Sequence, residues 1–147
     1  MMGEMGNGKW VEGKGGREMV KGKIEDFSQL RVWQKAKELT IEIYQITKSF
    51  PKVETYAIVD QIRRSSNSIC ANIAEGFSRY HGKDKMKFYY NARGSISEVR
   101  SHIFVAKELG YISNDNANKL LVEYETVKMM LNGLINSIAN HHRTRCP

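Results

Sequence analysis

Three side chains of this sequence have the types that acid–base or metal chemistry would need. They are Glu75 on one predicted helix and Glu98 and His102 on the next. A di-iron bundle needs a Glu-x-x-His pair on each of two helices, whereas Glu98 and His102 stand at positions i and i+4 and form a single pair. We therefore expect no metal, no cofactor and no catalytic residue. An enzyme that uses these three residues stays open as a third alternative.

Other kinds of catalytic or membrane segment are not indicated either. The chain has no glycine-rich phosphate loop followed by Lys and Ser or Thr, and no serine or cysteine at a strand-to-helix turn. Cys70 lies inside an apolar helical stretch, which favours a buried, inert thiol, and its distance from Cys146 fits no metal-ligand spacing. No apolar run approaches the roughly 20 residues that span a bilayer, and no signal peptide is recognisable. We expect a cytoplasmic protein that does not enter membranes.

Positive charge is concentrated in the middle of the chain. Residues 63–100 hold eight Lys and Arg against three acidic residues, which gives +5 of the total +7. Three lysines fall in the first turns of a predicted helix, where cations oppose the helix dipole at about 0.3–1 kcal/mol each. The charge favours binding to RNA or DNA, and the alternative is a solvated loop with accidental charge. The candidate nucleic-acid ligands are Arg79, Tyr80, His81, Lys83, Lys85, Lys87 and Arg93.

A second stripe of small polar residues runs beside the apolar face of one predicted helix. Its members are Gln61, Ser65, Ser68, Asn72, Glu75 and Arg79, with a shorter counterpart in Asn91, Ser95, Glu98 and His102. Ser and Asn are mediocre helix formers, so their use on a solvated face needs a reason. Three readings stay open: an exposed face with Glu75–Arg79 and Glu98–His102 pairs, a polar network or subunit interface, and a ligand site.

Four helices must position these residues. Apolar residues recur at spacings of three and four after Asp26, and only Pro51 interrupts the pattern before the last residue. The expected helices run from about Ser28 to Ser49, Thr55 to Phe77, Lys83 to Leu109, and from after Ser113 to about Asn140. Asp26 or Ser28 and then Ser113 are expected N-caps, and Gly110 is an expected left-handed C-cap. Short links make successive helices antiparallel, which predicts an all-α, up-down-up-down four-helix bundle.

The N-terminal segment differs in composition from the rest. Residues 1–25 hold seven of the twelve glycines and show no sustained periodicity. Such a segment buries too little apolar surface to offset its ordering entropy, so we expect it to be disordered. The expected organisation is a disordered Gly-rich segment at 1–25, a bundle at 26–140 and a basic frayed tail at 141–147.

Several motifs resemble a known family. They are Gln61-Ile-Arg-Arg-Ser-Ser-Asn-Ser-Ile69, then Asn72-Ile-Ala-Glu-Gly-Phe77 with Arg79, an opening with Phe27, Leu30 and Val32-Trp33-Gln34-Lys35-Ala36, and later Gly94-Ser95 and Gly110-Tyr111-Ile112. Together they resemble the four-helix bundle proteins encoded in intervening sequences of bacterial 23S ribosomal RNA genes. The resemblance covers about Asp26 to Ile138. Cys70 departs from the family pattern, in which proline is frequent, so the kink that proline would cause is not expected.

The resemblance implies a four-helix bundle that assembles as a homopentamer. The family is similar to accessory proteins of diversity-generating retroelements, which are basic pentamers that engage nucleic acid and a reverse transcriptase. It also implies a use for the polar stripe, as a network or subunit interface in which Glu98 is the partner of Arg64. The residues of this expected network are Gln61, Arg64, Ser68, Asn72, Glu75 and Glu98.

These observations favour a non-enzymatic, basic, oligomeric helical bundle that binds RNA or another nucleic acid. The alternative is a scaffold or adaptor that binds an acidic or helical protein partner and has no nucleic-acid role. The sequence does not identify such a protein partner.

Overall fold

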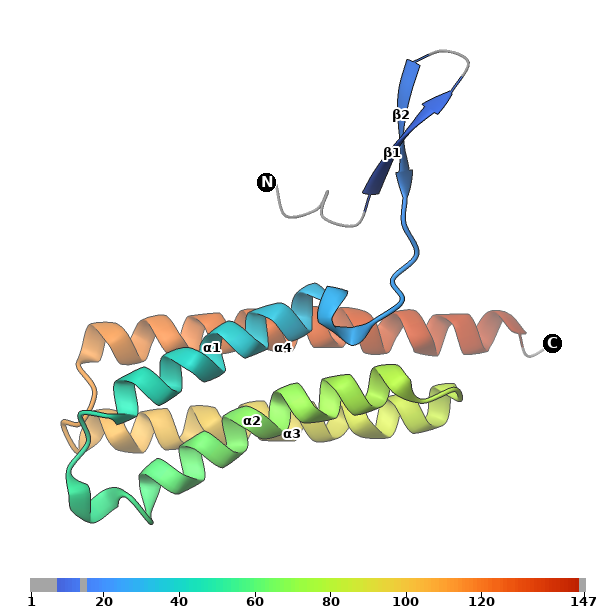
Figure 1. Cartoon of the computed structure of the whole chain (residues 1–147). Coiled ribbons are helices and arrows are strands. Elements are labelled where there is room, and N and C mark those ends of the chain that lie inside the picture. The colour runs from blue at the N-terminus through green and yellow to red at the C-terminus, as the bar shows by residue number, and fades with distance from the viewer. Residues whose placement is uncertain (1–7, 14–15, 146–147) are drawn as a thin grey trace.

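Four helices make up most of the chain after residue 26 and pack as one bundle (Figure 1). The computed structural model describes residues 8–13 and 16–145, with side chains from 22 to 141. The helices are α1 Arg31–Thr47, α2 Ile58–Ser78, α3 Gly82–Glu108 and α4 Asn114–Arg145. Successive helices run in opposite directions (Figure 1). The predicted antiparallel four-helix bundle is confirmed, and residues 26–145 are all-α.

The core contains the apolar stripes that the periodicity predicts. The stripe of α3 is buried along its whole length, because residues at spacings of three and four share one face of a helix. Isoleucines of α2 and leucines of α4 meet it in the centre, where Ile62, Ile73 and Leu131 are fully buried. Ile46, Phe77 and Ile138 are only partly buried at the margins. The buried part of the α3 stripe is Tyr89, Ala92, Ile96, Val99, Ile103 and Ala106.

The link between α3 and α4 has the predicted caps. Gly110 has a φ of 77°, and the Tyr111 amide donates to the Ala106 carbonyl at 2.9 Å. The two features together close α3 with a left-handed glycine cap. Ser113 then caps α4, since its hydroxyl oxygen accepts from the Asn116 amide at 3.2 Å.

The first helix begins later than its pattern predicts. Asp26 and Gln29 form a reciprocal capping box around a 3-10 turn, η2 (Phe27–Gln29). Leu30 is extended, with φ −70° and ψ 125°, so the α-helix begins at Arg31 and not near Ser28. A second 3-10 turn, η3 (Lys52–Glu54), similarly delays α2 until Ile58.

The N-terminal segment contains a β-hairpin, which differs from the expectation of a segment without regular structure. Strands β1 (Gly8–Gly13) and β2 (Gly16–Lys21) pair antiparallel, with Trp10 opposite Met19 and Val11 opposite Glu18. Trp and Val favour strands, and this local pairing outweighs the high glycine content over a few residues. The hairpin stands away from the helices in Figure 1. Residues 1–7 and 14–15 lie outside the described residues.

The last helix is longer than expected. Its backbone continues beyond Asn140 to Arg145, where a frayed tail was predicted from residue 141. No glycine or proline interrupts this stretch, and cations near a helix C-terminus interact favourably with the helix dipole. Among the described residues, no helix is both long enough and apolar enough to cross a membrane.

Candidate nucleic-acid interface

The basic end of the bundle is the tight connection between α2 and α3. Only Arg79, Tyr80 and His81 separate the two helices. Gly76 allows them to meet closely there, because a Cβ atom at this position would lie 2.7 Å from the Tyr89 ring and 3.1 Å from the Phe88 Cβ. The glycine of the Asn72–Phe77 motif therefore brings the first turns of α3 against the last turn of α2.

Lys85 is directed back toward α2. Its ammonium donates to the Phe77 carbonyl at 2.7 Å and the Gly76 carbonyl at 3.3 Å, and lies 5.4 Å from the Phe77 ring centroid. These carbonyls belong to the last turns of α2 and have negative partial charge. Partial burial lowers the pKa of Lys85. The structure thus uses this lysine to cap a helix.

Replacing Lys85 by Gln should lower the free energy of unfolding by about 1 kcal/mol, because the α2 carbonyls lose a charged donor. The matched control is Lys83→Gln, two residues earlier on α3. This control should be neutral or slightly stabilising, since it removes an exposed cation near a helix N-terminus. Urea denaturation followed by circular dichroism measures both variants. Equal stability of the two variants would contradict the capping role.

Lys83 and Lys87 are directed outward instead. They lie four residues apart, so they share one exposed face of α3. In the described part of the chain, neither forms an ion pair with a carboxylate. Tyr90 continues the same face one turn further and is partly exposed. This face can offer two cations and an aromatic ring to a phosphate backbone.

The two candidate arginines already have partners. The Arg79 guanidinium pairs with the Glu75 carboxylate at 2.6 Å and lies 4.8 Å from the Phe88 ring centroid. Arg93 donates to the Asn132 side chain of α4 at 3.1 Å and lies over Tyr90. Arg93 keeps its full charge because Asn132 is neutral, whereas the charge of Arg79 is offset locally.

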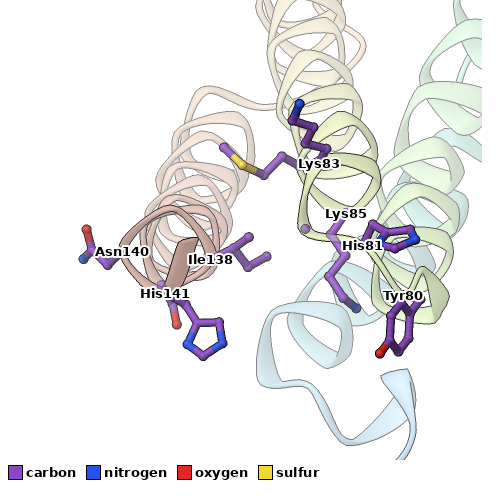
Figure 2. Close-up of a pocket in the computed structure, with 10 residues that line it drawn as sticks. Tyr80, His81, Lys83, Lys85, Ile138, Asn140 and His141 are labelled. Atoms are coloured by element: carbon purple, nitrogen blue, oxygen red, sulfur yellow. The ribbon is translucent and has the colours of Figure 1, made fainter. Parts of the chain in front are cut away.

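An open groove lies beside Tyr80 and His81, between α3 and the end of α4. Its volume is about 960 Å³. Tyr80 is 92% exposed, and its ring meets the His81 ring edge-on at a centroid distance of 5.1 Å. Figure 2 shows Tyr80, His81 and Lys85 on one side of the opening, with Ile138 and His141 on α4 across from them. The residues that line the groove are Tyr80, His81, Gly82, Lys83, Lys85, Met86, Ser137, Ile138, Asn140 and His141.

Sequence reasoning missed the α4 side of this groove. A frayed tail was expected from residue 141, so His141 was not placed on a helix. The signal was present in the antiparallel order of the helices, which places the end of α4 beside the start of α3. Extending the predicted last helix beyond Asn140 would have placed its final turns on the α4 side of the groove.

The expected polar network is present only at its centre. The Ser68 and Ser95 hydroxyls lie 2.9 Å apart and join α2 to α3, and the Asn72 amide donates to the Ser68 hydroxyl at 3.1 Å. Gln61 is exposed, and its backbone carbonyl accepts from the Ser65 hydroxyl at 2.9 Å. The small hydroxyls therefore let the two helices approach while satisfying one another's hydrogen bonds.

The predicted Arg64–Glu98 pair is not formed within the chain. Arg64 lies 3.7 Å from the Asp60 carboxylate, and Glu98 faces His102 at 3.6 Å. A partner one turn away on the same helix is reached at less entropic cost than one on a neighbouring helix.

The Glu75, Glu98 and His102 side chains are not assembled into one site. Gly76 is level with Tyr89 near the basic end, whereas the Ser68–Ser95 contact lies further along the helices. Glu75 is therefore several turns from Glu98 and His102. Among the described residues, no three His, Cys, Asp or Glu side chains lie close enough to hold a metal ion.

The Cys70 thiol is a half-buried side chain between α1 and α2. It lies 3.5 Å from the Thr40 hydroxyl, and burial raises its pKa. A raised pKa keeps the thiol protonated and therefore a poor nucleophile at neutral pH. This environment is that of an inert thiol.

The fold and its basic end define an antiparallel four-helix bundle protein. The model of the 23S rRNA-intervening sequence protein family matches residues 28–133, so the chain belongs to this family. This confirms the resemblance seen in the sequence. No protein among the curated sequences matches the chain.

A solved structure gives the same fold. The chain is similar to a protein of unknown function from the S23 ribosomal protein family of Bacteroides thetaiotaomicron. The two share 21% identity with a TM-score of 0.66, over 71% of this chain and 95% of the other. At this identity the likeness concerns the fold alone. The α4 side of the groove, from Ser137 to His141, lies beyond the residues that the family model matches.

Proposed function

We propose that this chain is a non-enzymatic, oligomeric bundle that binds RNA at the α2–α3 end. The observation that carries the proposal is the outward face of Lys83 and Lys87, whose cations have no carboxylate partner among the described residues. Membership of a family named for a ribosomal RNA intervening sequence is consistent with an RNA ligand.

The local balance of charge supports this choice of ligand. Three other cations of the segment are paired with carboxylates, since Arg64 contacts Asp60, Arg79 contacts Glu75 and Arg100 contacts Glu125. The first turns of α3 keep a positive field, since Lys83, Lys85 and Lys87 outnumber Asp84 there. A phosphate backbone fits that field, and the opening N–H groups of α3 add to it.

Binding to RNA should weaken steeply with salt and with loss of the outward lysines. Each phosphate contact releases counterions, so the logarithm of the affinity should fall by about 0.7–0.9 per log unit of salt for each contact. The variant Lys83→Gln/Lys87→Gln should bind about tenfold more weakly at low salt and show a flatter salt slope. Fluorescence anisotropy with labelled RNA at several salt concentrations measures both effects.

The matched control removes two exposed lysines at the opposite end of the bundle. Lys52 lies in η3 and Lys119 in the first turns of α4, and both are exposed. The variant Lys52→Gln/Lys119→Gln has the same net charge as the test variant and should keep the affinity of the parent. Equal losses in both variants would show that only total charge matters. Absence of RNA binding by the parent at low salt would refute the function.

We also propose that the polar stripe of α2 and α3 forms a subunit interface, in a ring of five as the family resemblance implies. Gln61, Asn91 and Glu98 lie exposed along this stripe, next to the Ser68–Ser95 contact. The small uncharged members of the stripe, Ser68, Asn72 and Asn91, leave room for another helix to approach closely. A ring would bring several copies of the Lys83–Lys87 face onto one assembly and multiply weak contacts.

Light scattering at micromolar concentration should give a mass several times the 16.9 kDa of the chain. Gln61→Arg should lower this mass, because a buried unpaired charge destabilises an interface. Gln45→Arg changes an exposed glutamine on α1 in the same way and should leave the mass unchanged. If the parent is a monomer, the polar stripe is an ordinary solvent-exposed face and the proposed subunit interface is wrong.

A protein-binding scaffold is the second candidate, favoured by apolar side chains near the other end of α3. Phe104 and Val105 are each 48% exposed and Leu109 is 54% exposed. Exposed large apolar residues in a group mark protein contacts more often than nucleic-acid contacts. This alternative would be supported if the parent bound a protein partner but no RNA, and if the variant Phe104→Ser no longer bound that partner.

A further inference from the structure

The groove between the start of α3 and the end of α4 has the features of a site for a flat, partly apolar ligand with negative charge. Its volume of about 960 Å³ lies at the upper end of the roughly 300–1,000 Å³ of small-ligand sites. Met86 and Ile138 form apolar wall and Lys83 supplies a cation, whereas the Lys85 ammonium is already held by the Gly76 and Phe77 carbonyls. Among the residues that line it there is no carboxylate.

The floor of the groove is held by a close approach of α3 to α4. A Cβ atom at Gly82 would lie 3.3 Å from the Ile138 Cγ2 atom, so the backbone of α3 comes near the α4 side chain. Across the opening from Ile138 lie the exposed Tyr80 ring and His81 (Figure 2). A ring that is 92% exposed beside a groove is available for stacking.

We propose that this groove takes one unpaired nucleotide of a single-stranded RNA, with the base against Tyr80 and His81 and the backbone phosphate against Lys83. The inference rests on the proposed function and adds to it a preference for unpaired bases. Bases in a duplex are stacked on their neighbours and do not present a free face, whereas an unpaired base does. An acidic peptide would match the lysines but would leave the rings and the apolar wall unused.

The test uses the full chain and a short RNA that carries one 2-aminopurine, as a single strand and as a duplex. Single-strand binding should quench the 2-aminopurine fluorescence, because the base stacks. Tyr80→Ala, and separately Ser137→Leu, which narrows the groove from α4 without adding a ring for a base to stack on, should weaken single-strand binding about tenfold and remove the quenching. Both variants should leave duplex affinity unchanged, since they remove no charge. Tyr56→Ala is the matched control, because Tyr56 is 95% exposed in the α1–α2 connection.

The outcomes separate this inference from the proposed function. Salt-sensitive RNA binding that is unchanged by Tyr80→Ala and Ser137→Leu would overturn the groove site and leave RNA binding in place. Equal losses of affinity for single-stranded and duplex RNA would also overturn it. So would a competition experiment in which poly-glutamate displaces the labelled RNA as well as unlabelled RNA does. Absence of any RNA binding by the parent at low salt would overturn both.

Discussion

Replacing Gly76 by Val should lower the free energy of unfolding by about 3 kcal/mol and open the basic end of the bundle. A Cβ atom at this position would lie 2.7 Å and 2.9 Å from two atoms of the Tyr89 ring. That ring is buried in the core and cannot move aside without displacing its neighbours. The two helices must therefore separate where Lys85 contacts the α2 carbonyls.

The control for this prediction is Gly94→Val on α3. A Cβ atom at Gly94 would meet nothing within 4 Å, so this variant should be neutral or gain a few tenths of a kcal/mol from better helix propensity. Urea denaturation gives both values. If the two variants unfold at the same urea concentration, the close contact at Gly76 does not constrain the packing.

Alkaline pH should unfold the protein more readily than its lysine content alone explains. Burial raises the pKa of Tyr89 from 10.0 to about 12 and raises that of Tyr124 further. In the unfolded chain these tyrosines ionise near pH 10, whereas in the folded chain they stay protonated. The stability from Tyr89 is therefore complete below about pH 10 and falls by about 2–3 kcal/mol as the pH rises to about 12.

The Phe variants isolate this effect. Tyr89→Phe and Tyr124→Phe should each flatten the fall of unfolding free energy between about pH 10 and 12. Both changes keep the ring, and the Tyr124 hydroxyl has no hydrogen-bond partner among the described residues. Tyr56→Phe, in which the ring is exposed, should leave the slope unchanged. Urea denaturation across this pH range measures the slope, and identical slopes in parent and variants would contradict the assignment.

The helical fold could be predicted because its signals are local and repeated. The α3 stripe from Tyr89 to Ala106 has regular spacing, and Gly110 and Ser113 mark the ends of helices by their own chemistry. The delayed start of α1 was not predictable in the same way. It depends on the reciprocal contacts of Asp26 and Gln29, which stabilise a short 3-10 turn before the helix.

The candidate site could be predicted by residue type but not by direction. Lys83, Lys85 and Lys87 look equivalent in the sequence, yet a helix turns about 100° per residue and directs Lys85 toward α2. Arg64 and Glu98 suit each other chemically, but Asp60 lies within reach of Arg64 on the same helix. The α4 side of the groove depends on how far α4 continues beside α3. The amino-acid composition of residues 141–147 did not predict this length.

The link of three residues between α2 and α3 also bears on the order of folding. Residues that meet across this link, such as Gly76 and Tyr89, are near in sequence, so little loop entropy opposes their first encounter. Proteins dominated by such local contacts fold quickly. We expect the α2–α3 hairpin to form in the transition state, with α1 and α4 joining it later. The end of the bundle that carries Lys83 and Lys87 would then be among the first parts of the molecule to become ordered.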